Sequence, residues 1–348
     1  PTGPAPTAER DSDLRSLIVE DPEGTLGRDV LTRFGAQLPY LLKLVGFVLG
    51  DGNIHFAGVR GHGVTWFWGK PEDLEDIRAD VVALGFTPSR IYTRKRHHAI
   101  DTTYGRSEFE FTEHSFKVVG SGFAILLHAL GAPVGNKAAQ DYTLPAWLSA
   151  APLWQVRLFL AALFGAELSA PKAFKSHNHS FYCPMLSMNK RAGYVESGRE
   201  FLQGISRLLA RFGVKTRTIS QRQEYTNADG DTSIRLRLVL GSKSPSLLNL
   251  WSRVGFEYNR TRRCLANVAA QYVRMKQCVQ PLPYARPVLL PAPVVLVESS
   301  LAGATADPVS RPLGYSKHHD YGIHGDEDEH HQRRVDEYAN DQFVFFPI

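Results

Sequence analysis

A short apolar phrase occurs twice in this chain, and each copy ends close to a single acid. Residues 44–52 read LVGFVLGDG, and residues 160–168 read LAALFGAEL. The acids Asp51 and Glu167 fall at equivalent positions of the two copies, with enough chain between them for one complete αββαββα unit. The repeat therefore predicts that the chain folds as two similar halves that meet at this phrase.

The apolar residues of each phrase predict a buried helix. Leucine and valine recur with helical spacing over residues 41–49, which is the pattern of a helix inside a core. Small residues at positions i and i+4 lie on one face of a helix, and such a face lets two helices approach closely. We expect the two helices to pack through four small residues across a pseudo-twofold axis, Gly46 and Gly50 against Ala162 and Ala166.

This packing would place the two acids side by side at the C-terminal ends of the helices. Carboxylates are disfavoured at the negative end of a helix dipole, and two neighbouring carboxylates repel each other. A divalent cation with oxygen ligands would compensate for both effects. The alternative is two ordinary core helices that each end in an acid by chance, and the matched flanking segments favour the paired arrangement.

The two phrases resemble the paired motifs of the LAGLIDADG (dodecapeptide-type) homing endonucleases, and in particular the single-chain forms embedded in inteins. The resemblance covers about residues 38–277. Residues 44–52 match the first motif, including its Gly-Asp-Gly ending. In the second motif, Leu168 stands where the family usually has glycine, and Gly165 replaces an acid that is not a metal ligand in the family.

The order of the predicted elements agrees with this resemblance. Helical and alternating patterns follow each other as αββαββα twice along the chain. The resemblance implies an α+β fold with two pseudo-symmetric halves packed through the paired helices, whose twisted antiparallel sheets form a DNA-binding saddle. We expect a lead-in over 1–37, a first half over 38–150, a second half over 151–277, and a Pro- and His-rich tail over 278–348 that resembles the start of a remnant intein splicing segment.

Basic residues gather in two stretches that occupy equivalent places in the two halves. The chain carries a net charge of +5, and arginine and lysine concentrate in residues 90–98 and 215–223. Clustered positive charge on strands is typical of a surface that binds a phosphate backbone. A solvated charged strand would explain either stretch alone, and the equivalent placement favours nucleic acid as the partner.

Cysteine usage and hydropathy indicate an intracellular protein of the cytoplasm or nucleoid. The 3 cysteines lack the CxxC spacing of a metal site, so we expect free thiols in a reducing compartment. The N-terminal residues are polar and lack the apolar core of a signal peptide. No stretch is apolar for long enough to predict a membrane span.

The resemblance implies a site-specific endonuclease for double-stranded DNA, a metal-dependent hydrolase that acts as a monomer and makes a staggered cut at a long pseudo-symmetric site. Asp51 and Glu167 would bind Mg²⁺, for which Mn²⁺ is a substitute, and the backbone carbonyls of Gly50 and Ala166 would assist. Magnesium keeps waters and shares substrate phosphates, so two carboxylates suffice from the protein. Metal bound in this way can activate a water molecule for hydrolysis.

A lysine at the end of the second strand of each half is expected to act as a base or to stabilise charge. Lys70 and Lys190 occupy this place in the sequences FWGK and SMNK, and the resemblance gives them a catalytic role. A lysine at a strand end is also commonly a solvated cap, so both interpretations stay open.

Polar side chains on the strands are the natural readers of the DNA major groove, where each base pair presents its own donors and acceptors. Side chains alternate between the two faces of a strand, so about half of the candidates would face DNA. The candidates are Asn53, His55, Arg60, Arg94, Arg96, Lys175, His177, Asn178, Arg217, Gln221, Gln223, Arg235 and Arg237.

Other functions fit the same motifs. A nuclease-dead LAGLIDADG protein would bind DNA or RNA as a transcription regulator or splicing maturase, but both acids are present, which favours the enzyme. An intein remnant that splices protein is disfavoured, because no splicing nucleophile opens the chain and no His-Asn closes it. The histidines between His318 and His331 could bind a metal, although a flexible polar tail is the better interpretation.

Overall fold

The computed structural model describes residues 34–57, 61–102, 105–174, 180–226 and 230–279. Helices and antiparallel sheets alternate along these residues, so the predicted α+β class is confirmed. Most of the predicted lead-in and nearly all of the predicted tail lie outside the described residues, and the proposed domain boundaries stay a prediction. No helix in the described ranges is long and apolar enough to cross a membrane.

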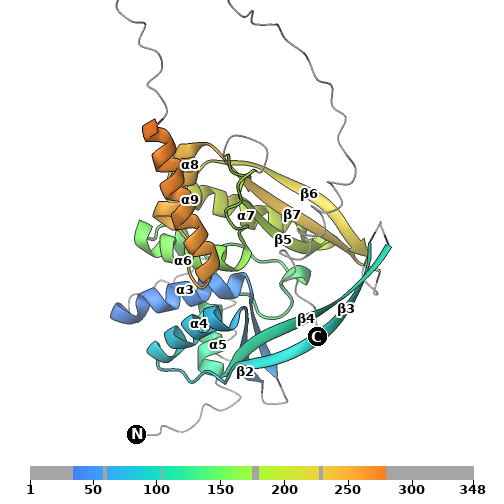
Figure 1. Ribbon diagram of the computed structural model, residues 1–348. Coiled ribbons are helices and arrows are strands. Elements are labelled where there is room, and N and C mark those ends of the chain that lie inside the picture. Colours follow the sequence, from blue (N-terminus) through green and yellow to red (C-terminus); the bar gives the residue numbers. More distant parts are fainter. Residues whose placement is uncertain (1–33, 58–60, 103–104, 175–179, 227–229, 280–348) are drawn as a thin grey trace, which may run out of the picture. The chain divides into compact units, whose positions relative to one another are not determined.

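The first half follows the predicted αββαββα order. Its strands form one antiparallel sheet in the order β1-β2-β4-β3, and the long β3–β4 hairpin extends away from the helices (Figure 1). The elements are α3 (Leu38–Leu49), β1 (Gly52–Ala57), β2 (His62–Trp68), α4 (Pro71–Ala83), β3 (Tyr92–Thr102), β4 (Gly105–Val119) and α5 (Ser121–Ala129).

The connector between the halves and the second half continue the chain. The connector contains the 3-10 helices η2 and η3, and the second sheet has the order β5-β7-β6. The elements are η2 (Lys137–Ala139), η3 (Ala146–Ser149), α6 (Leu153–Glu167), β5 (Met185–Arg191), α7 (Val195–Ala210), β6 (Thr216–Thr226), β7 (Thr232–Leu240), α8 (Ser244–Leu248), η5 (Asn249–Val254) and α9 (Arg260–Val279).

The second half differs from the predicted order by one strand. At the place of β1, the described residues contain isolated bridges between Leu168 and Leu186 and between Ala173 and Phe181. Pro171 lies between these bridges and lacks the N–H that a continuous ladder needs. The second sheet therefore has three strands in the described part of the chain, where the first sheet has four.

The start of α4 shows how the local sequence sets an element. Pro71 is the first helical residue, where its fixed φ suits the turn and its missing N–H breaks no helical bond. Glu72 and Asp73 follow in the first turn, where the helix dipole favours carboxylates. The buried residues Leu74 and Ile77 then turn one side of α4 toward the core.

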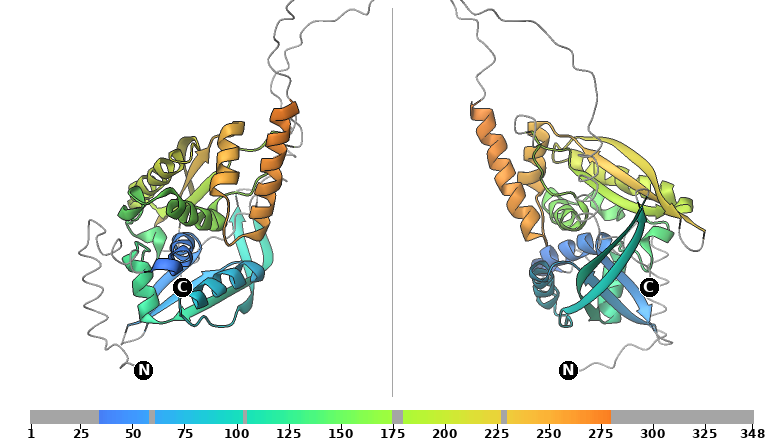
Figure 2. Two further views of the ribbon diagram at one scale, coloured as in Figure 1. Left: turned by 90° about the vertical axis from the view of Figure 1, so that its left-hand side faces the viewer. Right: turned by 45° about the vertical axis from the view of Figure 1, so that its right-hand side comes forward.

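The two repeated phrases form the helices α3 and α6, which pack side by side at the centre of the described unit (Figure 1; Figure 2). A methyl group added at Gly50 would lie 2.6 Å from Cβ of Ala166, so this predicted pair meets. A methyl group added at Gly46 would overlap the backbone of Phe159, which lies one turn before the predicted partner Ala162. Equivalent residues meet only at the C-terminal ends of the helices, so the pairing at Gly46 is shifted from the predicted one.

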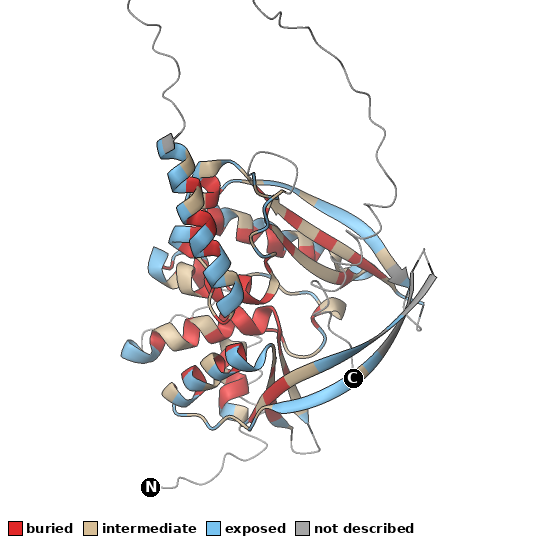
Figure 3. Ribbon diagram, viewed as in Figure 1, coloured by how far each residue is buried: buried red, intermediate tan, exposed pale blue. Residues whose placement is uncertain are grey.

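Each sheet turns one face toward the helices of its half. In the first sheet, Phe67 and Phe116 are fully buried and stack with 4.8 Å between ring centroids, and Phe67 also packs on Phe123 of α5. We call this the inner face, and the face that carries Trp66 and its register partner Lys117 the outer face. Figure 3 shows buried segments concentrated where α3 and α6 meet, and exposed segments along β3 and β6.

The second sheet has the same two faces. Leu236 and Leu238 are buried on its inner face, and Leu236 lies directly beneath Gly198 of α7. Arg235 and Arg237 alternate with these leucines along β7 and define the outer face.

The seam between α3 and α6 predicts that Gly46 does not tolerate a larger side chain. We expect Gly46→Ala to lower the free energy of unfolding by about 1–3 kcal/mol or more, because the new methyl group has no space. Urea denaturation measures this change. Gly122→Ala is the matched control, since a methyl group there meets no atom within 4 Å and should leave stability unchanged or raise it by up to about 1 kcal/mol. A Gly46→Ala protein as stable as the wild type would contradict the seam.

Candidate functional site

The two acids of the repeated phrases lie close together at the C-terminal ends of the paired helices. Asp51 follows α3 directly and is buried, and Glu167 is the last residue of α6. A methyl group added at Gly50 would lie 3.1 Å from Cγ of Glu167. Burial, and then the negative charge of Glu167, raise the pKa of Asp51 well above its usual range. The seam therefore places a buried acid, Asp51, beside the half-buried acid Glu167.

A buried lysine caps the first of these helices. Lys137 lies in η2 and is 8% exposed. Its Nζ donates to the carbonyl oxygens of Val48 at 2.9 Å, Leu49 at 3.1 Å and Gly50. These are the last three residues before Asp51, so the ammonium group neutralises the negative end of α3 beside the acid.

An arginine caps the second helix at the equivalent three residues. Arg262 of α9 donates through Nη1 to the carbonyl oxygens of Phe164 at 3.4 Å, Gly165 at 2.6 Å and Ala166 at 2.8 Å. Asn259 adds a bond to the carbonyl of Gly165 and accepts one from the backbone N–H of Arg262. Each acid thus has a cation on the three carbonyls that precede it.

The charges of these two cations reach the acid pair. Lys137 and Arg262 both lower the pKa of Asp51, against the larger effects of burial and Glu167. Burial lowers the pKa of Lys137 to about 8, and the charges of Glu167 and Asp51 oppose this shift. Neither cation was predicted from the sequence. Both cations follow the helix that comes after the second hairpin of their half. This equivalent position along the sequence is the signal that could have indicated them.

The structure places the two predicted lysines away from direct contact with the acids. Lys190 is fully buried, and its Nζ donates to the carbonyl oxygens of Lys137 at 2.9 Å and Gln140 at 2.8 Å. It also lies 4.0 Å from the ring centroid of Tyr142. Lys70 is exposed at the start of α4, with its Nζ 3.5 Å from Oγ1 of Thr261. Lys190 therefore holds the connector that carries Lys137.

The donor set of the acid pair fits a divalent cation in part. Asp51 and Glu167 offer two carboxylates in one place, which suits a hard cation that also binds waters and phosphate. The carbonyl oxygens of Gly50 and Ala166 already accept bonds from cationic groups, so we leave them out of the metal-binding set. Among the described residues, no group of three or more His, Cys, Asp or Glu side chains could hold a metal.

The second repeated phrase lies in a part of the chain that matches a known family. Residues 154–244 match the model of the LAGLIDADG-like domain. This chain contains a LAGLIDADG-like domain. The recognition of the family from the two repeated phrases is therefore confirmed.

Curated relatives of this LAGLIDADG protein are longer than the chain. A tRNA-splicing ligase RtcB from Methanocaldococcus jannaschii is 36% identical over 241 residues, which are 68% of this chain and 24% of that protein. The DNA-directed RNA polymerase subunit Rpo1N of the same organism is 27% identical over 248 residues, 71% of this chain and 18% of that protein. The chain thus spans about a quarter or less of these relatives.

A solved structure is also similar to the LAGLIDADG chain. It is the homing endonuclease I-WcaI bound to its DNA recognition sequence, with a TM-score of 0.41 and 11% sequence identity. The match covers 73% of this chain and 97% of that chain.

The strand register decides which predicted DNA readers of the first half share a face. The outer face holds four of them, Asn53, His55, Arg94 and Arg96. Asn53 donates to the carbonyl oxygen of Gly135 at 3.2 Å, and Nε of Arg96 lies 3.1 Å from Glu113. Burial and then the charge of Lys117 lower the pKa of His55, which favours its neutral form. Arg60 lies outside the described residues.

In the second half the register divides the predicted readers between the faces. Arg235 and Arg237 lie on the outer face, and Arg235 pairs with Glu224 at 3.2 Å. Gln221 and Gln223 are opposite Leu236 and Ile234, on the face toward α7. Arg217 is exposed within a register irregularity of β6. The remaining candidates lie outside the described residues: Lys175, His177 and Asn178.

An aromatic cluster on the outer face was not expected from the sequence. Trp66 and Trp68 stack with 5.9 Å between ring centroids, and Tyr92 lies 6.4 Å from Trp66. Lys117 lies 5.2 Å from the Trp66 ring, within the range of a cation–π contact. Alternation along each strand does not show which side chains of neighbouring strands share a face. The pairing register shows that these side chains lie on the same face as Asn53.

The burial of Lys190 predicts a pH-dependent contribution to stability. Folding lowers its pKa from 10.5 to about 8, chiefly through burial and against the charge of Asp141. Between these values the unfolded chain binds more proton, so the contribution of Lys190 to the free energy of unfolding rises with pH. We expect the difference between wild type and Lys190→Met to rise by about 2 kcal/mol from pH 8 to pH 10 in urea denaturation. A difference that stays constant over this range would contradict the burial of a charged amine.

Proposed function

We propose that this LAGLIDADG protein is a site-specific endonuclease that hydrolyses phosphodiester bonds of double-stranded DNA with a divalent metal. One observation carries the proposal. Two acids from distant parts of the chain meet at a helix seam, and each stands beside a cation on three equivalent carbonyls. This doubled arrangement suits two related reactions, one on each DNA strand, and a staggered cut at a long pseudo-symmetric site.

The chemistry follows from the charges at the seam. A divalent metal, Mg²⁺ or Mn²⁺ in its place, would neutralise phosphate charge and activate a water molecule there, held by Asp51 and Glu167. Lys137 uses three donors on three carbonyls, and an ammonium group has three N–H donors. It therefore stabilises the charge of the acids and of the incoming phosphate.

The outer faces of the two sheets are the proposed DNA-binding surface. They carry most of the described readers, and the helices pack on the opposite faces. Nε of Arg237 is buried without a hydrogen-bond partner in the described part of the chain. An unpaired buried donor is costly, and a base edge or phosphate oxygen would satisfy it. We propose Asn53, His55, Arg94, Arg96, Arg235 and Arg237 as contacts in this surface.

We also propose that the chain is an inserted, intein-associated element and acts as a monomer. Segments of similar length in a tRNA-splicing ligase and in an RNA polymerase subunit resemble it, although those proteins are named for unrelated activities. A module that moves between genes explains this pattern without giving the chain a ligase or polymerase activity. Both acids come from one chain, so the site needs no second copy.

The central test is cleavage of a randomised duplex library by the purified chain with Mg²⁺, followed by sequencing of the cut ends. We expect cuts at one long motif, and a loss of about a thousandfold or more in Asp51→Asn and Glu167→Gln, because each change removes a metal ligand. Both variants should still bind the selected duplex.

Glu196→Gln is the control, since Glu196 is exposed and pairs only loosely with Arg199 at 3.5 Å. It should cut at the wild-type rate. Binding without any cleavage by the wild type would instead indicate a nuclease-inactive DNA-binding protein. Unchanged cleavage in Asp51→Asn would refute the site.

Substitutions on the two faces of the second sheet should differ in their effect on DNA affinity. We expect Arg237→Ala to weaken binding of the selected duplex by about tenfold or more, whereas Gln223→Ala on the inner face changes it by less than about twofold. Electrophoretic mobility shift at fixed salt measures both affinities. Equal effects, or a larger effect at Gln223, would show that DNA does not lie on the outer face.

A further inference from the structure

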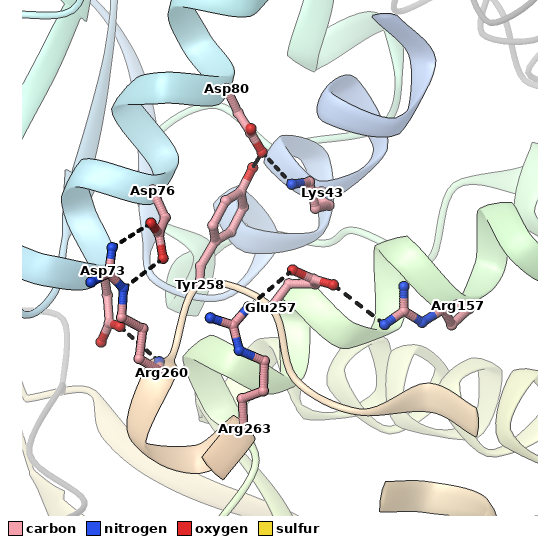
Figure 4. Close-up of polar contacts among 9 residues, drawn as sticks. All are labelled: Lys43, Asp73, Asp76, Asp80, Arg157, Glu257, Tyr258, Arg260 and Arg263. Carbon is pink, nitrogen blue, oxygen red and sulfur yellow. Dashed lines mark hydrogen bonds and ion pairs between the residues drawn. The ribbon is translucent and has the colours of Figure 1, made fainter. Parts of the chain in front are cut away.

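Residues 257–263 end the connection from η5 and include the first turn of α9, and they contact elements of both halves. Tyr258 is buried, and its hydroxyl donates to Oδ2 of Asp80 in α4 at 2.5 Å (Figure 4). Lys43 of α3 lies 2.5 Å from the same oxygen and 5.1 Å from the Tyr258 ring centroid. Tyr258 also has a φ of +55°, which a non-glycine residue adopts only where its surroundings hold it.

A second group of bonds fixes Arg260, two positions after Tyr258. The backbone N–H of Arg260 donates to Oδ1 of Asp73 at 2.8 Å. Its guanidinium group donates twice to Asp76, at 3.0 Å and 2.7 Å (Figure 4). Two parallel bonds from arginine to one carboxylate set orientation as well as distance. Three acids of α4, in the first half, therefore hold the 257–263 segment.

The same segment is held against α6 on its other side. Glu257 donates its backbone N–H to the carbonyl of Ala161 at 2.8 Å, and its carboxylate faces Arg157 at 3.3 Å and Arg263 at 3.9 Å (Figure 4). Glycine at position 165 permits this approach, because a methyl group there would overlap the carbonyl oxygen of Glu257. The segment is thus clamped between α4 and α6.

Arg262 lies within this clamped segment and caps the helix that ends in Glu167. Its position therefore depends on α4, an element of the other half. The converse holds for Lys137, which caps the helix that ends in Asp51. Lys190, on β5 of the second half, donates to the carbonyl oxygens of Lys137 and Gln140. Each of the two cations is therefore held in part by the half to which its acid does not belong.

We propose that these contacts form a cross-brace between the two halves. In this cross-brace, residues of one half position the cation that lies beside the acid of the other half. Tyr258, Arg260 and Lys190 are positioning residues in this arrangement, since they act through Arg262 and Lys137. The inference rests on the proposed nuclease function. The expected consequence is selective. Removal of a positioning residue impairs the one acid and cation that it serves, and therefore slows the cut of one DNA strand more than the cut of the other.

The test measures the cleavage rate of each strand of the selected duplex, labelled at one 5′ end or the other. Arg262→Ala and Lys137→Met first identify the strand that depends on each cation. We expect Arg260→Ala to slow the Arg262-dependent cut by about tenfold or more and the other cut by less than about threefold, with nicked duplex accumulating. Lys190→Met should slow the Lys137-dependent cut in the same selective way.

Two further variants keep the test decisive. Asp76→Asn removes the same ion pair from the side of α4 and should reproduce the strand preference of Arg260→Ala, even if that variant folds poorly. Glu75→Ala is the control, because it removes an exposed pair with Arg78 on the same helix (2.7 Å) and should leave both rates unchanged. Equal slowing of both strands in Arg260→Ala and Asp76→Asn, or no slowing, would overturn the cross-brace.

Failure of the proposed nuclease function can be told apart from failure of the cross-brace. If the wild type cuts no duplex, the nuclease proposal fails, and urea denaturation of Arg260→Ala, Arg262→Ala and the double variant decides the brace. Coupled residues lose less together than the sum of their separate losses. A double variant whose midpoint falls by less than that sum supports the brace, and strictly additive losses overturn it.

Discussion

The close approach of α3 and α6 is the contact on which the rest of the site depends. Gly50 lies against Ala166 and Glu167 without space for a side chain, so two acids from distant parts of the chain lie together, with Asp51 buried and Glu167 half-buried. Burial and mutual repulsion raise the pKa of Asp51, which makes the arrangement unfavourable on its own. Lys137 and Arg262 partly offset this cost by neutralising the ends of both helices, and a divalent cation would offset more of it.

The seam and the acids were predictable because the information is local. Small residues four apart and an acid at the end of a helix can be read directly from a repeated phrase. Lys137 and Arg262 could not be found in this way. Lys137 lies in a connector and Arg262 in the first turn of α9, and bonds to other elements position both segments. The shift of Gly46 onto Phe159 also depends on how the helices cross, which spacing alone does not determine.

The strands show a different limit. Alternation along β6 and β7 was visible in the sequence, but which alternate set faces outward depends on register and on the bulges of β6. The pairing of Gln223 with Ile234 and the outward position of Arg237 became clear only with the sheet in place. In the described residues the second half has no strand that matches β1. The two halves are therefore related by their paired helices and the cations on the ends of these helices more closely than by their sheets.

The most direct measurement of the central claim is the anomalous X-ray scattering of Mn²⁺ in crystals of the chain bound to its selected duplex. We expect manganese density between the carboxylates of Asp51 and Glu167, in contact with a phosphate oxygen of the DNA. Manganese bound only elsewhere, with the two carboxylates far from the duplex, would contradict it.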